Sequence, residues 1–371
     1  MLKEVIENDI YPIALGAGIL GTGGGGNPYL GSVHLREVIR TLGPQRILDP
    51  RELADDALVA LVGFIGAPTA SIEKLSEGTE LLRALRLLEE HLECSFAAVG
   101  IIEIGGANAM GPLVAGLQAG LPTIDADGMG RAFPEVQMLT FVFQGNVSPA
   151  PFVMTDAGPG SVVVPHVANA VWAERLSRNI ATSMGASAGW AGFVMRGAQF
   201  KAHAIPYTLS LAHALGKKVL EAQARGDDVP QTIAEQLSGR LILRGKITDV
   251  LRRTSRGFAR GSVTIEGFGR SREQLFIEFQ NEFLIAYLDG EVVATVPDLI
   301  CIVTEETGEP VTTEVLHYGT RVAVLVVPAA AALKTPAALE VVGPRAFGYQ
   351  VSYNPVPGNR IGCEELLSGE I

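Results

Sequence analysis

A run of glycines near the N-terminus is the first segment of this sequence whose residue types could bind a small molecule. Residues 20–27 read Leu-Gly-Thr-Gly-Gly-Gly-Gly-Asn. Consecutive glycines are costly to order unless the backbone itself is needed, because glycine loses more conformational freedom on folding than any other residue. Their exposed N–H groups could form a nest for an anion or an oxyanion. The candidate substrate-binding residues of this run are Thr22, Gly23, Gly24, Gly25 and Asn27.

The same run formally satisfies the dinucleotide fingerprint G-x-G-x-x-G, and Asp49 follows at a spacing typical of a ribose-binding acid. The context argues against this interpretation, because residues 11–20 contain Pro and Gly and look more helical than strand-like. No Gly-Lys-Ser or Gly-Lys-Thr is present, which excludes a P-loop. We therefore expect no nucleotide. A turn whose glycines only let two elements pack closely stays open as the structural alternative.

A second candidate site lies where an apolar run ends. Residues 96–104 form that run, and Glu103 near its end is followed by Gly-Gly-Ala-Asn. In open α/β sheets, ligands bind beyond the carboxyl ends of the strands. Glu103 is therefore a candidate catalytic residue, and Asn108 is a candidate substrate-binding residue. The alternative is that Glu103 caps the next helix or pairs with an arginine.

An acidic turn, residues 123–135, concentrates the third set of candidates. A carboxylate crowded by other carboxylates can have its pKa raised into the range that suits a general acid or base. Alternate residues of an extended segment point to opposite faces, so only one of Asp125 and Asp127 can face a given pocket unless the chain bends between them. The candidate catalytic residues here are Asp125, Asp127 and Glu135, with Arg131 as a candidate substrate-binding residue. We expect this turn and the glycine run to border a common cleft.

The sequence leaves the cofactor unknown. No H-E-x-x-H or H-x-H pair occurs, so a metal site would have to be assembled by folding. A divalent metal is compatible with the acidic turn, and its candidate ligands are Asp127 and His203. For any single histidine of this chain, a structural role is the simpler interpretation.

The elements that position these residues follow an α/β pattern in the first half of the chain. Apolar runs over residues 57–65 and 96–104 predict buried strands, and leucine spacing over residues 81–92 predicts an amphipathic helix. We expect an α/β N-terminal domain with glycine-rich loops, followed by a C-terminal domain that begins with helices and then changes to alternating, strand-like periodicity. The expected bounds are residues 1–165 and 166–371, with helices over 166–238 and mainly β structure over 239–371.

Composition limits the partners. The chain of 371 residues has 29 Lys and Arg against 40 Asp and Glu, a formal charge of −11. No basic patch suited to phosphates is visible, so we expect no nucleic acid. The longest apolar stretches fall short of a membrane span, and the N-terminus carries acids where a signal peptide carries bases. We expect a cytoplasmic protein that binds a small-molecule substrate, does not bind membranes and forms a homo-oligomer.

Together these motifs resemble those of the S-methyl thiohydantoin desulfurase-like family. The resemblance rests on the glycine run, on residues 103–108 and on residues 125–135. It extends to three further segments: Phe-Gln-Asn-Glu at 279–282, Val-Pro-Asp-Leu-Ile at 296–300 and Gly-Pro-Arg-Ala-Phe-Gly-Tyr at 343–349. Members of the family were long described only as a domain of unknown function associated with hydantoinase and oxoprolinase systems, and the family name divides them into two domains. The resemblance spans nearly the whole chain.

The resemblance implies a hydrolase of a thiohydantoin- or hydantoin-like cyclic amide. The reaction it suggests is conversion of an S-methyl thiohydantoin to a hydantoin with loss of methanethiol. Such a site needs a general base, a donor for the charge that develops on the ring and a route for the thiolate. The alternative is a non-catalytic accessory protein that binds hydantoinase subunits. A nucleotide-dependent oxidoreductase is disfavoured by the weak strand signal before Gly21.

Overall fold

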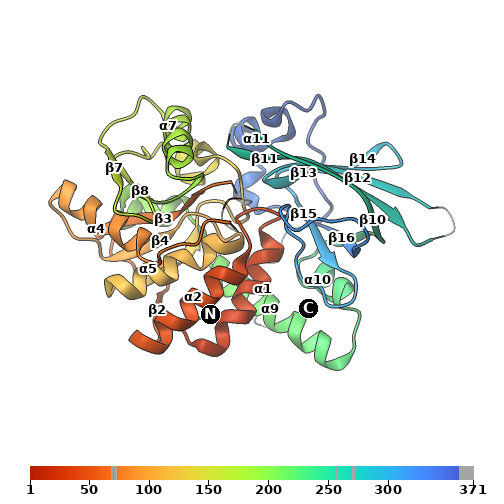
Figure 1. Cartoon of the computed structure of the whole chain (residues 1–371), viewed down its shortest axis with the longest axis horizontal. Helices are drawn as coiled ribbons and strands as arrows, with labels where there is room; N and C mark the ends of the chain where they lie inside the picture. The colour runs from red at the N-terminus through yellow and green to blue at the C-terminus, as the bar shows by residue number, and fades with distance from the viewer. Residues whose placement is uncertain (68–69, 71–72, 256, 270–271, 359–371) are drawn as a thin grey trace.

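The computed structural model describes residues 1–67, 70, 73–255, 257–269 and 272–358. The described chain forms a mixed helix-and-sheet part and a part built on a curled antiparallel sheet (Figure 1). No helix of the described residues is long and apolar enough to cross a lipid bilayer.

The first sheet has nine strands in the order β1-β2-β5-β4-β3-β8-β6-β7, with β9 paired to β5. Strands β2, β5, β4 and β3 are parallel, whereas the strands on either side pair antiparallel. The bounds of the strands in sheet order are β1 Glu4–Val5, β2 Gln45–Leu48, β5 Thr123–Asp127, β4 Ala98–Ile101, β3 Leu58–Gly66, β8 Ser187–Arg196, β6 Phe152–Thr155, β7 Ser161–Val164 and β9 Ile205–Pro206.

Both faces of this sheet are covered, which is why its central strands are apolar throughout. Along β3, Ala60 and Val62 pack with the leucines of α4, whereas Val59 and Leu61 pack on the opposite side with Phe200. Alternate strand residues point to opposite faces, so a strand buried on both sides needs apolar residues at consecutive positions. The helices packed around this sheet are α2 Pro28–Leu42, α4 Glu80–Leu92, α5 Gly111–Ala119, α6 Thr140–Phe143, α7 Ala170–Ser183 and α8 Gly197–His203.

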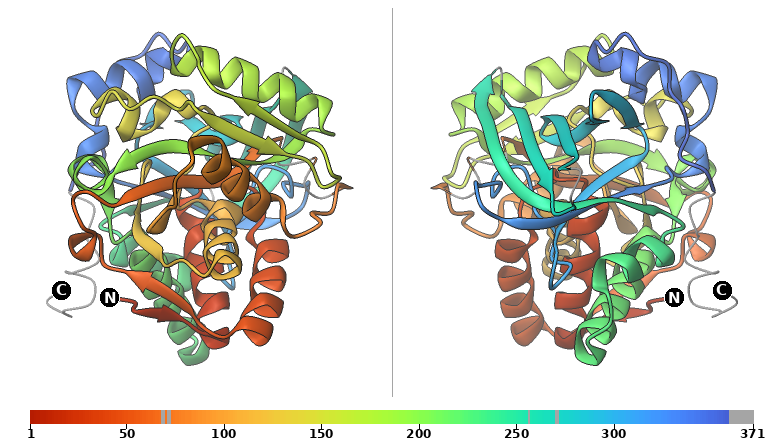
Figure 2. Two further views of the ribbon diagram at one scale, coloured as in Figure 1. Left: turned by 90° about the vertical axis from the view of Figure 1, so that its left-hand side faces the viewer. Right: turned by 90° about the vertical axis from the view of Figure 1, so that its right-hand side faces the viewer.

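The second sheet has seven strands, all antiparallel, in the order β14-β13-β12-β11-β10-β16-β15. The right panel of Figure 2 looks onto its long curved strands. Asp289 and Gly290 connect β13 to β14 with φ angles of 50° and 87°, as a two-residue hairpin turn requires. The strand bounds are β10 Arg240–Ser255, β11 Phe258–Gly267, β12 Gln274–Gln280, β13 Glu282–Leu288, β14 Glu291–Thr295, β15 Leu299–Thr304 and β16 Arg321–Val327.

Three helices join the two parts: α1 Ile10–Leu20, α9 Thr208–Arg225 and α10 Val229–Gln236. Helices α1 and α9 touch backbone to backbone, because a Cβ on Gly16 would lie 1.9 Å from the carbonyl oxygen of Ala212. Their apolar side chains share one core with Leu299 and Leu325 of the second sheet. The short helix α11 Pro336–Val342 follows the last strand of the second sheet and packs against α6.

The expected helical stretch over residues 166–238 is wrong in one respect. It contains α7, α8, α9 and α10, but also β8 and β9, which complete the first sheet. Small residues dominate β8, and its glycines allow close packing: a Cβ on Gly189 would lie 2.9 Å from Thr155 Oγ1. A glycine-rich strand lacks the β-branched residues that indicate a strand in an amino-acid sequence. Mainly β structure was expected for residues 239–371, and the second sheet lies within this range; residues 359–371 lie outside the described residues.

Candidate functional site

A cavity of about 390 Å³ lies at the carboxyl ends of β3 and β4. This volume suits a small organic ligand. Further segments enclose the cavity, among them the end of the glycine run, the start of α2, the segment before α5, the acidic turn, the start of β8 and the tight turn between β12 and β13. Apolar side chains, among them Phe64, Ile102 and Trp190, line much of its wall. The cavity therefore draws on both parts of the molecule.

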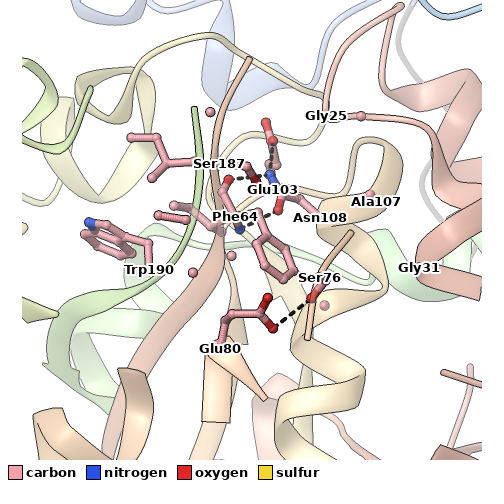
Figure 3. Close-up of a pocket in the computed structure, with 18 of the residues that line it drawn as sticks. Gly25, Gly31, Phe64, Ser76, Glu80, Glu103, Ala107, Asn108, Ser187 and Trp190 are labelled. Carbon is pink, nitrogen blue, oxygen red and sulfur yellow. Dashed lines mark hydrogen bonds between the residues drawn. The ribbon is translucent and has the colours of Figure 1, made fainter. Parts of the chain in front are cut away.

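Glu103 is fixed at the wall of this cavity by two hydrogen bonds. The Asn108 side-chain amide donates to Oε1 over 2.6 Å, and the Phe133 backbone N–H donates to Oε2 over 3.1 Å. Asn108 is itself anchored to β3, because its Oδ1 accepts from the Phe64 N–H over 2.7 Å. Figure 3 shows Glu103, Asn108 and Phe64 joined in this way. Asn108 thus orients the carboxyl group that the sequence marked as a candidate base.

Burial raises the pKa of Glu103 to about 7. The negative charge of Asp127 pushes in the same direction, whereas the two hydrogen bonds and the charge of Arg178 oppose the rise. A carboxyl group with a pKa near neutrality exchanges its proton readily at physiological pH, which is the property that a general base or acid needs.

Glu135 and Arg178 line the cavity close to Glu103. Glu135 Oε1 accepts a hydrogen bond of 3.4 Å from Gln280 of the second sheet, and burial raises the pKa of Glu135. The Arg178 guanidinium is buried and bonded on several sides: to Glu174 Oε1 over 2.7 Å and to the carbonyl oxygens of Gly66 and Pro134 over 2.9 Å each. Arg178 therefore holds α7 against β3 and the acidic turn.

Glu282, the first residue of β13, lines the cavity, although it was not among the candidate site residues predicted from the sequence. Its segment was among those that carry the family resemblance, but neither charge spacing nor strand periodicity distinguished it from an ordinary strand residue. Folding brings it beside the glycine run, so that a Cβ on Gly24 would lie 2.0 Å from Glu282 Oε1.

The glycine run both packs and lines the cavity. It joins α1 to α2, so a helix and not a strand leads into the G-x-G-x-x-G pattern. The Gly25 carbonyl accepts a hydrogen bond of 2.9 Å from the Ala107 N–H, and a Cβ on Gly25 would lie 2.2 Å from the Gly105 carbonyl oxygen. Asn27 caps α2 through a 2.9 Å bond from the Tyr29 N–H to its Oδ1. Gly25 and Asn27 also line the cavity.

Thr22, Gly23 and Arg131 lie at the contact between the two parts, outside the cavity lining. Arg131 is fully buried and donates to Thr22 Oγ1 over 2.6 Å. It also donates to the Pro297 and Asp298 carbonyl oxygens over 2.9 Å each. A Cβ on Gly23 would lie 2.5 Å from the Phe283 ring, which explains a glycine at this position.

Asp125 and Asp127 do not face the cavity, although the sequence marked both as candidate acids or bases. Asp125 Oδ1 accepts hydrogen bonds of 3.0 Å from the Leu209 and Ser210 N–H groups, at the start of α9. Asp127 accepts from the N–H groups of Ile104, Met129 and Gly130 over 2.8 to 3.2 Å. Both residues belong to β5, which lies between β2 and β4 inside the first sheet. Backbone N–H groups therefore surround the two carboxylate groups. Their catalytic roles stay untested predictions.

The described side chains do not favour a metal site. Among residues 1–67, 70, 73–255, 257–269 and 272–358, no group of three or more His, Cys, Asp or Glu side chains is arranged to hold a metal ion. His203 ends α8 next to Gly145 and outside the cavity lining, and the Asp127 oxygens face backbone N–H groups.

The expected common cleft is confirmed for part of each segment. Gly25 and Gly26 of the glycine run border the same cavity as Met129, Phe133 and Glu135 of the acidic turn. Of the sequence-predicted site residues, the cavity lining brings together Glu103, Glu135, Asn108, Gly25 and Asn27.

The fold and the cavity describe a two-part α/β protein with an acid-lined pocket where its parts meet. Comparisons with known proteins identify the family to which the chain belongs. The S-Me-THD-like N-terminal domain matches residues 8–166, and the S-Me-THD-like C-terminal domain matches residues 168–356. The chain belongs to the S-methyl thiohydantoin desulfurase-like family.

Among solved structures, a crystal structure of a protein from Chromobacterium violaceum is similar to this fold. The TM-score is 0.81 at 24% sequence identity, with 95% of this chain and 99% of that chain covered. At this identity the likeness concerns the fold alone. No match was found among the curated proteins.

Proposed function

We propose that this protein hydrolyses a thiohydantoin- or hydantoin-like cyclic amide, with an S-methyl thiohydantoin as the first substrate to test. Water replaces the methylthio group at the ring carbon between the two nitrogens, and the products are a hydantoin and methanethiol. Family membership supports the substrate class, and the chemistry of the cavity supports hydrolysis.

Glu103 is the observation that carries this proposal. It is a buried carboxyl group with a pKa of about 7, held by Asn108 and the Phe133 N–H at the wall of the cavity. In its ionised form it accepts a proton from water as the water oxygen attacks the ring carbon. Neither hydrogen bond is made by a cation, so Glu103 is not locked in a salt bridge.

The rest of the cavity suits a small ring. Its volume of about 390 Å³ accommodates a five-membered ring with a substituent. Glu135, which also lines the cavity, accepts a hydrogen bond from a ring N–H group when its carboxyl group is ionised. Phe64 and Ile102 supply the apolar wall against which the ring and its substituent pack.

Turnover by the purified protein tests the proposal. Wild-type protein is mixed with an S-methyl thiohydantoin, and released methanethiol is measured with a thiol-reactive dye. We expect kcat/KM to rise with pH through about 7, as Glu103 loses its proton. Glu103→Gln keeps the shape of the side chain but removes the base, and should lower kcat by about 10²-fold or more.

Glu89→Gln is the matched control. Glu89 is also a buried carboxyl residue of the first part, but it accepts from the Phe96 N–H and from Arg86 and does not line the cavity. Its turnover should equal that of the wild type. A wild-type protein that releases no methanethiol alone, yet raises the activity of an added hydantoinase, would refute the hydrolase proposal in favour of the accessory role.

A further inference from the structure

The turn that carries Glu282 is built to hold this residue in one place. Asn281 lies between β12 and β13 with a φ of 59°, a left-handed conformation that asparagine tolerates better than most residues. Its side-chain Oδ1 accepts a hydrogen bond of 2.9 Å from the Ala259 N–H, and its carbonyl accepts one of 2.8 Å from Thr313 Oγ1. The following residue is thereby directed at the glycine run and the cavity.

In the described part of the chain, one oxygen of the buried Glu282 carboxyl group lacks the hydrogen-bond partner that a buried carboxylate needs. The residue is 2% exposed, and its Oε2 has no hydrogen-bond partner among the described residues. Burial raises the pKa of Glu282 well above its ordinary value, and the charge of Glu103 adds to the rise, whereas Arg131 and Arg178 oppose it. A carboxyl group in this setting holds its proton at neutral pH and can donate it.

We propose that Glu282 is the proton donor of the cavity and forms an acid–base pair with Glu103. The inference rests on the proposed hydrolase function and adds a catalytic residue from the second sheet. Two carboxyl groups in one cavity, one ionised and one protonated, are the arrangement that hydrolysis of an amidine-like carbon requires.

The proton movements balance in two steps. In the first, Glu103 takes a proton from water, the water oxygen bonds to the ring carbon, and the C=N electron pair moves onto nitrogen, which takes the Glu282 proton. In the second, the new hydroxyl group returns a proton to Glu282 as its C=O bond forms. The C–S bond breaks at the same time, and the departing sulfur takes the proton held by Glu103. Both residues regain their starting states, and the products are a hydantoin and methanethiol.

Glu282→Gln tests the donor role, because the amide keeps the size of the side chain and cannot transfer a proton as a carboxyl group does. We expect kcat to fall by about 10²-fold or more. We also expect the wild-type rate to decline at high pH, where Glu282 ionises, and this decline to be absent in Glu282→Gln. Glu89→Gln again serves as the control, because Glu89 is a buried carboxyl residue that lies outside the cavity lining. Its kcat should not change.

Gly24→Ala provides a second test, which keeps the Glu282 carboxyl group in the protein but displaces it. Gly24 does not have a positive φ, and the three atoms nearest to the added Cβ all belong to the Glu282 side chain. We expect Gly24→Ala to lower kcat by displacing that carboxyl group. The double variant with Glu282→Gln should be no slower than Glu282→Gln alone, because both changes act on the same group.

An infrared measurement separates the donor role from turnover. At pH 7 the wild-type spectrum should contain a protonated-carboxyl band that is lost in Glu282→Gln and kept in Glu103→Gln. If the wild type releases methanethiol but Glu282→Gln is equally fast, or if no such band is lost, the donor role is refuted and the hydrolase function stands. If the wild type releases no methanethiol under any condition, the hydrolase function is refuted, and the donor role with it.

Discussion

At the scale of single residues, the cavity gathers carboxyl groups that water cannot reach easily. Glu103 and Glu282 are both nearly fully buried, and their negative charges disfavour each other's ionised form. Burying an ionised carboxyl group is costly, so such groups hold their protons to higher pH. A raised pKa in the folded state makes the free energy of unfolding depend on pH, and this dependence can be measured.

The stability of the protein should therefore depend on Glu103 in a pH-dependent way. The folded state binds the Glu103 proton more tightly than the unfolded state, so its stabilising contribution is present below pH 4.5 and is lost as pH rises through about 7. A pKa rise from 4.5 to about 7 corresponds to about 3 kcal/mol. Urea unfolding of wild type and Glu103→Gln at pH 5 and pH 8 measures it.

Relative to Glu103→Gln, the wild type should be about 2 to 3 kcal/mol more stable at pH 5 than at pH 8. The variant itself is the reference, because every other buried carboxyl group is common to both proteins. An equal difference at the two pH values would show that Glu103 titrates like an exposed glutamate.

At the scale of elements, the glycine run packs closely against the loop that follows β4. The turn after α1 lies against the turn after β4, with Gly25 touching Gly105 and Gly106 touching Gly26 through their backbones. Positive φ angles at Gly23, Gly25 and Gly26 add a second reason for glycine. The run thus brings the start of α2 to the wall of the cavity.

Gly25→Ala and Gly120→Ala separate these two reasons. Both glycines have positive φ, 73° and 72°, but a Cβ on Gly25 would lie 2.2 Å from a carbonyl oxygen, whereas nothing lies within 4 Å of one on Gly120. Backbone strain alone should cost each variant about 1 kcal/mol, and the overlap should cost Gly25→Ala at least about 1 kcal/mol more. Denaturant midpoints and slopes measure both. Equal losses would mean that the loops separate easily.

At the scale of the whole molecule, Arg131 joins the two parts. Its guanidinium comes from the acidic turn, and its hydrogen bonds reach the glycine run and the segment before β15. A buried cation surrounded by oxygen acceptors is strongly held, because its removal leaves those acceptors unpaired. The cavity depends on this contact, since Glu282 reaches it only when the second sheet is docked.

Arg131→Met should destabilise the protein by about 2 to 5 kcal/mol, because the buried carbonyl oxygens of Pro297 and Asp298 lose a charged donor. Arg40→Met is the control: Arg40 pairs with Glu7 on the exposed surface, so its loss should change stability little. Chemical denaturation followed by tryptophan fluorescence measures both variants. Similar midpoints for the two would show that Arg131 does not hold the parts together.

The sequence by itself determined the elements whose signals are local. Leucine spacing predicted α4, and apolar runs predicted β3 and β4. The sequence also placed Glu103 and Asn108 at the end of a strand. This was possible because the end of an apolar run and the glycines of the following turn are adjacent in the chain. These features depend on periodicity and backbone preference, which need no knowledge of distant contacts.

Only the tertiary structure decided which acids share the cavity. Asp125 and Asp127 look as reactive as Glu103 in sequence, but the path of β5 surrounds them with backbone donors. Glu282 looks like an ordinary strand residue, but docking of the second sheet buries it beside Gly24. Burial and charge proximity arise from contacts between residues far apart in the chain, and these set the pKa of a carboxyl group and therefore its chemistry.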